Sequence, residues 1–438
     1  MSHRRLTAAC VLVVLLLAGA LAPLGAAPIA HREVLPNGIV LLVAERPAVP
    51  IVAVRAFMRA GASFEPPDRA GLANLTGALL TRGTAGRSGP EIDAAIEFVG
   101  GSLEAGAGRD GLTASLFVLK RDLGLGLDLL GEVVRSPTFP EAELTREAAQ
   151  IQAAIKRSEE DPGTVAARAL APLVFARHPY GRPVEGTIDS VGKLTREDVI
   201  AFHRDHVRPD TTIVAVVGDV TVDEARREVL ARFGGWPRPT TPPPPRPAQA
   251  GPTTSRAEVI AKDLTQSTIV LGRPAIRQVD PDYFPLAVAS YVLGGGSASR
   301  LYARVRDDGG LAYAVYAYVS PGRYGASLVL SAQTRTGAVP KVLGMLRDEL
   351  ARMAREPIGE DELRLAKDYL IGSFPLRLDT TSKVADFVVA IEEQGLGLDY
   401  ADRYRAAIAR VTAADVQRVA GRFFGPDTFS RVLVGATK

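Results

Sequence analysis

The sequence has little of several residue types that would point to particular classes of protein. Among its 438 residues there is a single cysteine, Cys10, and there are 5 histidines. One thiol excludes a disulfide framework and any zinc or iron–sulfur site built from several cysteines. Net charge is also small, because 52 Lys and Arg stand against 49 Asp and Glu. A formal charge of +3 does not favour nucleic-acid binding by overall electrostatics.

The composition is that of a folded globular protein. Hydrophobic residues make up 47% and charged residues 23%, which excludes a disordered chain. At about 150 residues per domain, the length favours two or three domains with sizeable cores.

Residues 1–27 have the pattern of a secretory signal peptide. Arg4 and Arg5 precede an uncharged stretch whose most apolar part runs from Val11 to Leu17, and small residues follow up to Ala27. An uncleaved membrane anchor is the alternative, although the apolar run is short for a membrane span. Removal of this segment leaves no cysteine and lowers the net charge from +3 to +1. We therefore expect an exported chain, periplasmic or extracellular, or anchored to the membrane if the signal stays uncleaved.

A proline-rich linker over residues 236–256 divides the rest of the chain. Its first part, WPRPTTPPPPRPAQAGPTT, has no apolar period and favours extended polyproline II, which acts as a semi-rigid spacer. The predicted domains are residues 28–235 and 257–438, each near the usual domain size.

The two predicted domains share an internal repeat. KLTREDVIAFHRDHVRPDTTIVAVVG at 193–218 aligns without gaps with RVTAADVQRVAGRFFGPDTFSRVLVG at 410–435, at an offset of 217. Each copy predicts a Thr-capped helix, a Pro-Asp turn and a short apolar strand. We therefore predict an α+β fold of two homologous domains, each a mixed β-sheet flanked by helices.

Other segments support this fold class. Residues 39–44 and 51–58 are predicted to form a strand pair, and four further strands are expected at 111–119, 267–271, 312–319 and 325–332. Helices are predicted at 70–81, 141–158, 339–356 and 359–370.

Residues 62–84, ASFEPPDRAGLANLTGALLTRGT, resemble the pitrilysin/insulinase family of zinc peptidases, which includes the mitochondrial processing peptidases. In that family a helix after a strand carries H-x-x-E-H. Here the five positions are Asn74-Leu75-Thr76-Gly77-Ala78. Asn74 and Ala78 replace the two histidines, and Gly77 replaces the glutamate.

The third zinc ligand of the family, a glutamate on a later helix, is also missing. The matching stretch is Ala153-Ala154-Ile155, with alanine at the candidate positions. A hydrolytic zinc needs three protein ligands, an open position and a base, and Gly and Ala offer no side-chain ligand. We therefore expect no metal and no catalytic residue in this chain alone.

The remaining histidines give little support for a different metal site. His203 and His206 lie three apart on a predicted helix and could share a face, but their repeat partners are Ala420 and Phe423. A packing or surface role is favoured over metal binding. His178, in RHPYGRPVEGT, is in a segment that resembles a family loop, and we expect it to be structural.

Residues 294–319, GGGSASRLYARVRDDGGLAYAVYAYV, resemble the second-domain motif of the same family. Arg306 and Tyr313 stand seven apart, and by this resemblance they contact the substrate across a cavity. An Arg and a Tyr offer fixed donors for peptide carbonyls and an oxyanion. A surface Arg and a half-buried strand Tyr are the alternative, and Arg304 is a weaker candidate for the arginine role.

The glycine run Gly294-Gly295-Gly296 is open to two interpretations. No Gly-Lys-Ser/Thr follows it, so a phosphate-binding loop is not indicated. It resembles the glycine-rich loop of processing-peptidase partner subunits, but a plain turn next to a helix would use glycine equally.

The resemblance implies a processing-peptidase-like metallohydrolase fold and a division of labour between subunits. We expect a non-catalytic, substrate-binding subunit of an exported heterodimeric zinc metallopeptidase that acts on peptides. The zinc would be on a partner subunit of the same family with an intact H-x-x-E-H. The alternative is a structural or peptide-binding scaffold with no role in proteolysis.

Overall fold

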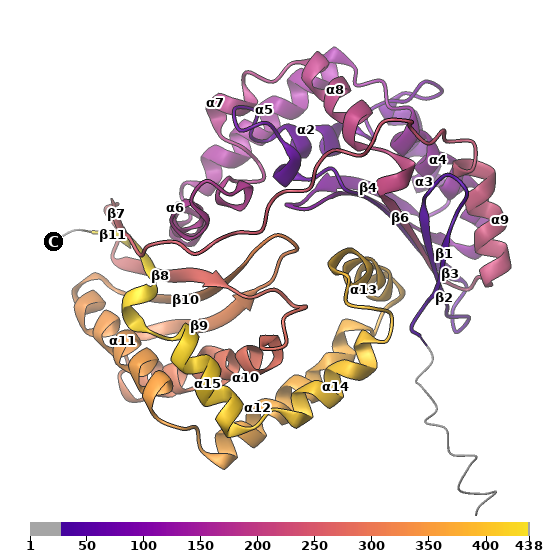
Figure 1. The fold of residues 1–438 in the computed structure, drawn as a ribbon. Helices are drawn as coiled ribbons and strands as arrows, with labels where there is room; N and C mark the ends of the chain where they lie inside the picture. Colours follow the sequence, from indigo (N-terminus) through magenta and orange to yellow (C-terminus); the bar gives the residue numbers. More distant parts are fainter. Residues whose placement is uncertain (1–27, 437–438) are drawn as a thin grey trace, which may run out of the picture.

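The computed structural model describes residues 28–436, and these form two β-sheets, each flanked by helices (Figure 1). The predicted signal peptide lies outside the described residues. The N-terminal half contains β1 (His31–Val34), β2 (Val40–Glu45), β3 (Ile51–Met58), α2 (Leu72–Leu79), α3 (Gly89–Phe98), β4 (Ser102–Ala107), β5 (Leu112–Leu119), α4 (Leu123–Arg135), α5 (Glu141–Ser158), α6 (Pro162–Phe175), α7 (Ile188–Val191), α8 (Arg196–His206), β6 (Thr212–Gly218) and α9 (Val222–Phe233). The C-terminal half contains β7 (Ala257–Ala261), β8 (Gln266–Ala275), α10 (Tyr283–Gly294), β9 (Ala312–Ser320), β10 (Ala326–Arg335), α11 (Val339–Arg355), α12 (Glu360–Ser373), α13 (Thr381–Gln394), α14 (Tyr400–Arg410), α15 (Ala413–Phe423) and β11 (Ser430–Gly435).

The two sheets have the same topology, which confirms the predicted fold of two homologous units. The first has the order β1-β2-β6-β3-β5-β4 and the second β7-β11-β8-β10-β9. Without β1, the five strands correspond one to one, and the only parallel pairs are β2 with β6 and β7 with β11 among the described strands. The sequence repeat covers α8 to β6 and α15 to β11. Thr195 and Thr412 cap their helices identically, because each accepts a hydrogen bond from the backbone N–H three residues on.

The expected pairing of residues 39–44 with 51–58 is wrong. Both segments are strands, but β6 lies between β2 and β3, parallel to β2 and antiparallel to β3. All seven residues of β6 are buried. A strand that is apolar on both faces is stabilised in the middle of a sheet, so it displaces the local hairpin. The other predicted strands and helices are present within a few residues of their expected ends.

Each half contributes one helix to the inner face of the other half's sheet. Leu170 and Val174 of α6 pack against Val270, Val432 and Val434 of the C-terminal sheet. In return, α13 packs on the N-terminal sheet through a buried cluster: Leu42, Ala53, Ala215, Val217, Val384, Ala385 and Val388. Figure 1 shows both helices between the sheets. This reciprocal burial joins the halves through apolar surface.

Polar contacts also cross between the halves. The Tyr180 hydroxyl donates to the carboxylate of Asp110 at 2.6 Å and accepts from the Tyr324 backbone N–H at 3.1 Å. Arg55 of β3 forms an ion pair with Asp386 of α13 at 2.6 Å. Tyr180 is buried, so its hydroxyl depends on these partners for hydrogen bonding.

The segment between the halves is held against the N-terminal half. No helix or strand lies between Phe233 and Ala257, and the predicted domain boundaries stay predictions. The buried Arg208 donates to the carbonyls of Thr241 and Pro242 at 2.7 and 3.2 Å. His178 Nε2 lies 2.9 Å from the carbonyl of Ala248. These contacts fix the proline-rich segment along the surface, so it does not act as a free spacer.

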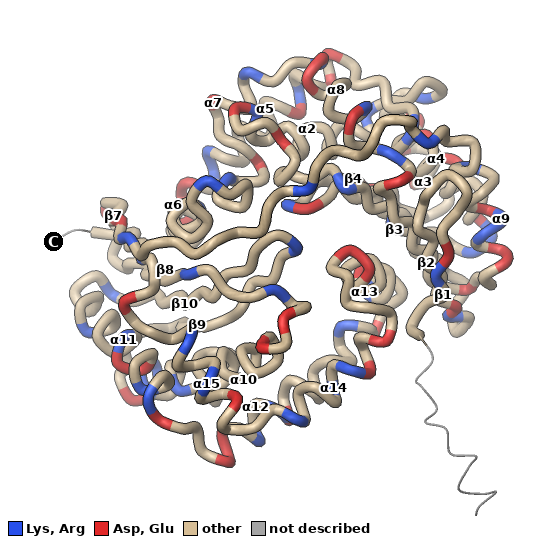
Figure 2. Tube along the Cα trace, in the orientation of Figure 1, with Lys and Arg blue, Asp and Glu red and all other residues tan. Residues whose placement is uncertain are grey.

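Charged residues of both signs are distributed along the part of the chain that the structure describes (Figure 2). Lys and Arg alternate with Asp and Glu along the chain (Figure 2), as the small net charge requires. Within residues 28–436, no helix is both long and apolar enough to span a bilayer.

We expect Tyr180→Phe to lower the free energy of unfolding by about 1–3 kcal/mol, because the buried Asp110 carboxylate and Tyr324 N–H lose their shared partner. Urea denaturation measures the change. The matched control is Tyr369→Phe, because the Tyr369 side chain is exposed. Equal stability of the two variants would contradict a bridging role for Tyr180.

Because of Glu393 of α13, we expect the stability of the folded protein to depend on pH. Burial, and then the nearby Asp110, raise the pKa of this carboxyl to about 7, against the opposing effect of Arg323, Arg59 and Arg246. The folded state therefore holds the proton more tightly than the unfolded state, and stability falls as pH rises from about 4.5 to about 7.

Glu393→Gln removes that titration. The stability of the wild type minus that of the variant should fall by about 1–3 kcal/mol between pH 5 and pH 8. Urea denaturation across this range tests it, and a difference that stays constant with pH would show that Glu393 does not titrate there.

Candidate functional site

Two equivalent glycines mark the same place in both halves. Gly77 of α2 and Gly294 at the end of α10 are 217 residues apart, the offset of the repeat. A Cβ on Gly77 would lie 2.9 Å from the backbone carbon of Gly106 in β4. A Cβ on Gly294 would lie 2.5 Å from the backbone nitrogen of Ala317 in β9. In each half a helix therefore touches the edge strand more closely than any side chain allows.

The degenerate zinc-site positions of the N-terminal half hold residues that do not suit a metal. Asn74 and Ala78 are half-buried on α2, and Gly77 is buried against β4. Ala153 and Ala154 are exposed on α5. None of these side chains except the Asn74 amide can coordinate, and β4 fills the space of a glutamate at position 77. In residues 28–436, no three His, Cys, Asp or Glu side chains are grouped as metal ligands.

The histidines of α8 lie in packing positions. His203 Nε2 is 2.9 Å from the carbonyl of Val134, and its ring packs edge-on against Phe139. His206 packs on Phe202 with ring centroids 4.5 Å apart. Burial lowers the pKa of both imidazoles. The favoured packing role is consistent with these contacts.

A buried carboxylate at the start of α2 was missed by the sequence analysis. Glu65 accepts hydrogen bonds from the backbone N–H groups of Ala73 at 2.6 Å and Gly71 at 3.3 Å. Burial raises its pKa to about 7 despite these donors. Glu65 fixes the beginning of α2. It lies outside the H-x-x-E-H positions, and no motif identified it.

The equivalent place in the C-terminal half is open. A cavity of about 530 Å³ is lined by α10, from Tyr283 to Gly294, and by residues 316–319 of β9. Tyrosine rings and glycine backbone form much of its wall, and the lining includes Tyr283, Ser290, Tyr291, Gly294, Gly295, Tyr316, Tyr318, Ser331 and Arg377. Tyr291 and Gly294 stand at the repeat positions of Asn74 and Gly77. The cavity thus occupies, in the second copy, the place of the degenerate zinc site in the first.

Polar groups in this cavity can bind a ligand by hydrogen bonds. Ser290 is only 3% exposed, and its hydroxyl has no hydrogen-bond partner in the part of the chain that the structure describes. Burial raises the pKa of Tyr283 to about 12, so its phenol stays a neutral donor. Arg377 supplies a cation. Buried polar groups of this kind bind ligands that supply the missing partner.

The structure brings Arg306 and Tyr313 together. Arg306 belongs to a π-helical turn, Tyr302–Asp308, and its guanidinium carbon lies 4.7 Å from the ring centroid of Tyr302 and 5.0 Å from that of Tyr313. Two aromatic faces hold one cation by cation–π attraction. Their contact with a substrate, assigned by resemblance, stays a prediction.

A β-bulge explains why Tyr313 is exposed. Val315 and Ala317, at alternate positions along β9, are buried in the core, and simple alternation would bury Tyr313 with them. The register between β9 and β10 shifts between Gln333 and Thr334, which leaves Tyr313 as the extra residue. The bulge turns its side chain out, and it is 79% exposed.

The turn that carries Arg306 is held by a network of ion pairs around the buried Glu349. Arg300 donates to both oxygens of Glu362, at 2.6 and 2.7 Å, and Glu349 beside it is fully buried. Arg304 turns toward α11 and donates to Glu349 at 3.2 Å and Asp348 at 3.3 Å. The Arg304 guanidinium is therefore occupied by these ion pairs, while Arg306 contacts the rings of Tyr302 and Tyr313.

β9 ends its sheet, so the backbone groups on its outer edge are unpaired within the described strands. Tyr316 and Tyr318 stand along this edge and are half exposed. A free edge can pair with an extended chain through main-chain hydrogen bonds. In the sequence, tyrosines at alternate positions of the strand are the signal that could have identified this free edge.

The glycine loop is shaped by close packing. Gly295 follows α10, where a Cβ would lie 2.5 Å from the Tyr291 ring, and Gly296 lies near the Tyr291 hydroxyl. Gly294 and Gly295 line the cavity. These positions require glycine because a side chain would overlap Tyr291 or β9. A ligand can approach the glycine backbone closely.

Comparison with protein-family models identifies two matches. The model described as insulinase (peptidase family M16) matches residues 40–188, and the one described as peptidase M16 inactive domain matches residues 193–370. An uncharacterized zinc protease of Streptomyces coelicolor is 32% identical over 403 residues, which cover 90% of this chain and 87% of that protein. An uncharacterized zinc protease of Bacillus subtilis is 25% identical over 79% of this chain and 84% of its own length.

Solved structures share the fold. A peptidase M16 inactive domain from Pseudomonas fluorescens superposes with a TM-score of 0.88 at 26% identity, covering 93% of this chain and 98% of that chain. A protease from Helicobacter pylori superposes with a TM-score of 0.86 at 20% identity, covering 93% and 100%, which supports the fold alone.

Gly77→Ala should lower the free energy of unfolding by about 1–3 kcal/mol, because its Cβ would overlap the backbone of β4. The control is Gly344→Ala on α11, where no atom lies within 4 Å of an added Cβ. That change should raise stability by about 0.5–1 kcal/mol through helix propensity. Thermal and urea unfolding compare the two, and a stabilising Gly77→Ala would mean that α2 has room for a side chain.

Proposed function

The chain belongs to the insulinase family of peptidases, peptidase family M16, and on that basis we propose that it is the non-catalytic, peptide-binding subunit of an exported heterodimeric zinc metallopeptidase. The zinc is on a partner of the same family with an intact H-x-x-E-H. One observation carries this proposal. The Arg306–Tyr313 pair is assembled at the start of β9, the strand whose Tyr316 and Tyr318 line a cavity, in a chain whose degenerate zinc-site positions hold Asn74, Gly77 and Ala78.

The names of similar proteins point in two directions. The Streptomyces relative is named a zinc protease, and the Pseudomonas structure is named an inactive domain. For this chain the residues favour a non-catalytic role, because a water-activating zinc needs three ligands and a base. Gly77 lies too close to β4 for a glutamate to occupy its position.

The chain's own residues bind and orient a peptide. The free edge of β9 offers backbone donors and acceptors to an extended segment, and Tyr316 and Tyr318 flank it. The cavity at the glycine loop takes one end or side chain of the peptide. Arg306 and Tyr313 donate to peptide carbonyls, and to the oxyanion that develops when the partner's zinc site acts on the substrate.

Export is proposed from residues 1–27 alone, whose basic start and short apolar run are typical of a signal peptide. A cysteine-free mature chain would fold without oxidation in that environment.

The test mixes the purified chain with a zinc-bearing H-x-x-E-H subunit of the same family from the same organism, and follows cleavage of a quenched fluorescent peptide. Arg306→Ala and Tyr313→Phe should each lower kcat/KM by about 10- to 100-fold, because each removes a donor to the transition state. Neither variant disturbs a buried group, so folding should be retained.

The controls are Arg364→Ala and Tyr369→Phe, which change exposed side chains on α12 and should leave the rate unchanged. A mixture that stays fully active with both Arg306→Ala and Tyr313→Phe would remove the assigned role. If the chain never stimulates a zinc-bearing partner, the scaffold alternative holds instead.

A further inference from the structure

The two halves differ at one pair of neighbouring strands, which a helix covers in the N-terminal half and no described helix covers in the C-terminal half. In the N-terminal half, α9 follows β6 and packs Ala225, Val229 and Phe233 into the main core. The same cluster buries one side of β2 and β6, through Leu41, Val43, Val214 and Val216. Within residues 28–436, no helix follows β11 to cover the matching side of β7 and β11.

The strand register identifies the matching residues. Leu41 pairs with Val214 in the first sheet, and Ala257 pairs with Arg431 in the second. Because Val214 and Arg431 are 217 residues apart, Ala257, Val259, Arg431 and Leu433 are the counterparts of the four buried residues. We call these four the β7–β11 strip. Val43 is 1% exposed, whereas its counterpart Val259 is 52% exposed.

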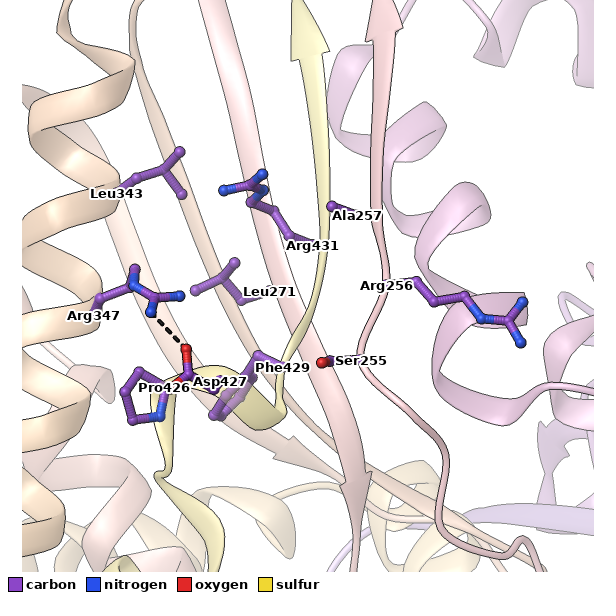
Figure 3. Close-up of a pocket in the computed structure, with 10 residues that line it drawn as sticks. All are labelled: Ser255, Arg256, Ala257, Leu271, Leu343, Arg347, Pro426, Asp427, Phe429 and Arg431. Carbon is purple, nitrogen blue, oxygen red and sulfur yellow. Dashed lines mark hydrogen bonds and ion pairs between the residues drawn. The ribbon is translucent and has the colours of Figure 1, made fainter.

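A cavity of about 260 Å³ lies between the β7–β11 strip and α11 (Figure 3). Leu271 and Leu343 give it an apolar wall, and Arg347 and Arg431 stand on either side. Arg256 also borders it, but its side chain points away in Figure 3. The strip and the cavity beside it thus combine an open apolar surface with two cations, Arg431 of the strip and Arg347 of α11.

The charge of this surface differs from that of its counterpart. Val214 is replaced by Arg431, so a helix placed like α9 would meet a guanidinium where α9 meets a methyl group. Among the described residues that line the cavity, Asp427 is the single acid, and it pairs with Arg347 at 2.6 Å while most of its side chain is exposed. Arg431 has no ion-pair partner within residues 28–436, so it is available to pair with an incoming carboxylate.

We propose that the β7–β11 strip binds an amphipathic helix of a partner protein in the position that α9 takes in the N-terminal half. Its apolar residues recur every fourth position, as Ala225, Val229 and Phe233 do. Its flank carries Asp or Glu facing Arg431 and Arg347. Apolar area gives the helix its affinity, and the charges select an acidic flank. This surface is separate from the β9 cavity, so the proposal stands without the peptide-binding role.

The test uses two stapled, fluorescein-labelled peptides of α9, residues 222–233. The acidic probe carries Arg226→Glu, Arg227→Glu and Arg232→Glu, and the neutral probe has the native sequence. Fluorescence anisotropy with the full chain should show the acidic probe binding at least tenfold more tightly. Arg431→Glu and Val259→Asp in the chain should each weaken it about tenfold or more.

The control is Arg405→Glu on the exposed face of α14, which should leave the affinity unchanged. Because Val259 is exposed, Val259→Asp tests the surface without risk to folding. The proposal is overturned if neither probe binds, if both bind equally, or if the acidic probe tolerates Arg431→Glu. It is also overturned if inorganic phosphate alone binds at Arg431 as tightly as the acidic probe, since the site would then serve small anions.

Discussion

The arrangement of this protein depends on the exchange of α6 and α13 between its halves. The inner face of each sheet is lined by Val and Ala side chains, and the helix that covers part of it comes from the other half. Neither sheet can bury that face with its own helices, which lie on the opposite side. The apolar exchange therefore fixes one half against the other. Tyr180 and the Arg55–Asp386 pair then set the orientation with directional contacts.

Within this arrangement, the same close contact between a helix and an edge strand occurs in both halves, in different surroundings. Gly77 and Gly294 each let a helix touch the backbone of an edge strand. In the N-terminal half this contact leaves no room for a Cβ at position 77, where a side chain would overlap the backbone of β4. In the C-terminal half α10 ends at its glycine, and the tyrosine-lined cavity begins there. The same contact thus lies next to the half-buried Asn74 and Ala78 in one copy and borders a cavity in the other.

The sequence predicts those features that depend on local pattern. The repeat from Thr195 and Thr412 onward gives the duplicated fold, and a stretch rich in Ala, Glu and Arg that stops before Pro162 gives α5 at its observed ends. The order of the strands in the sheet could not be predicted from the sequence, because the placement of β6 between β2 and β3 depends on burial of both faces of β6. The exposure of Tyr313 depends on a bulge whose register belongs to β10 as well as β9. Glu65 could not be found either, because its burial comes from packing and its partners are backbone groups.

Because the two halves share one fold, equivalent surfaces of the halves can be compared directly. Two copies of one fold need the same core, so differences between equivalent surfaces indicate where their roles diverge. At the two places compared above, the N-terminal copy has β4 packed against Gly77 and α9 packed over Val43. The C-terminal copy is open at both, and each opening carries arginine, Arg377 at the cavity and Arg431 at the strip. Burying a cation without a partner is costly, so these arginines are compatible with surfaces that stay wet or meet an anionic group. The C-terminal half therefore carries both surfaces for which a binding role is proposed, the cavity beside Gly294 and the β7–β11 strip.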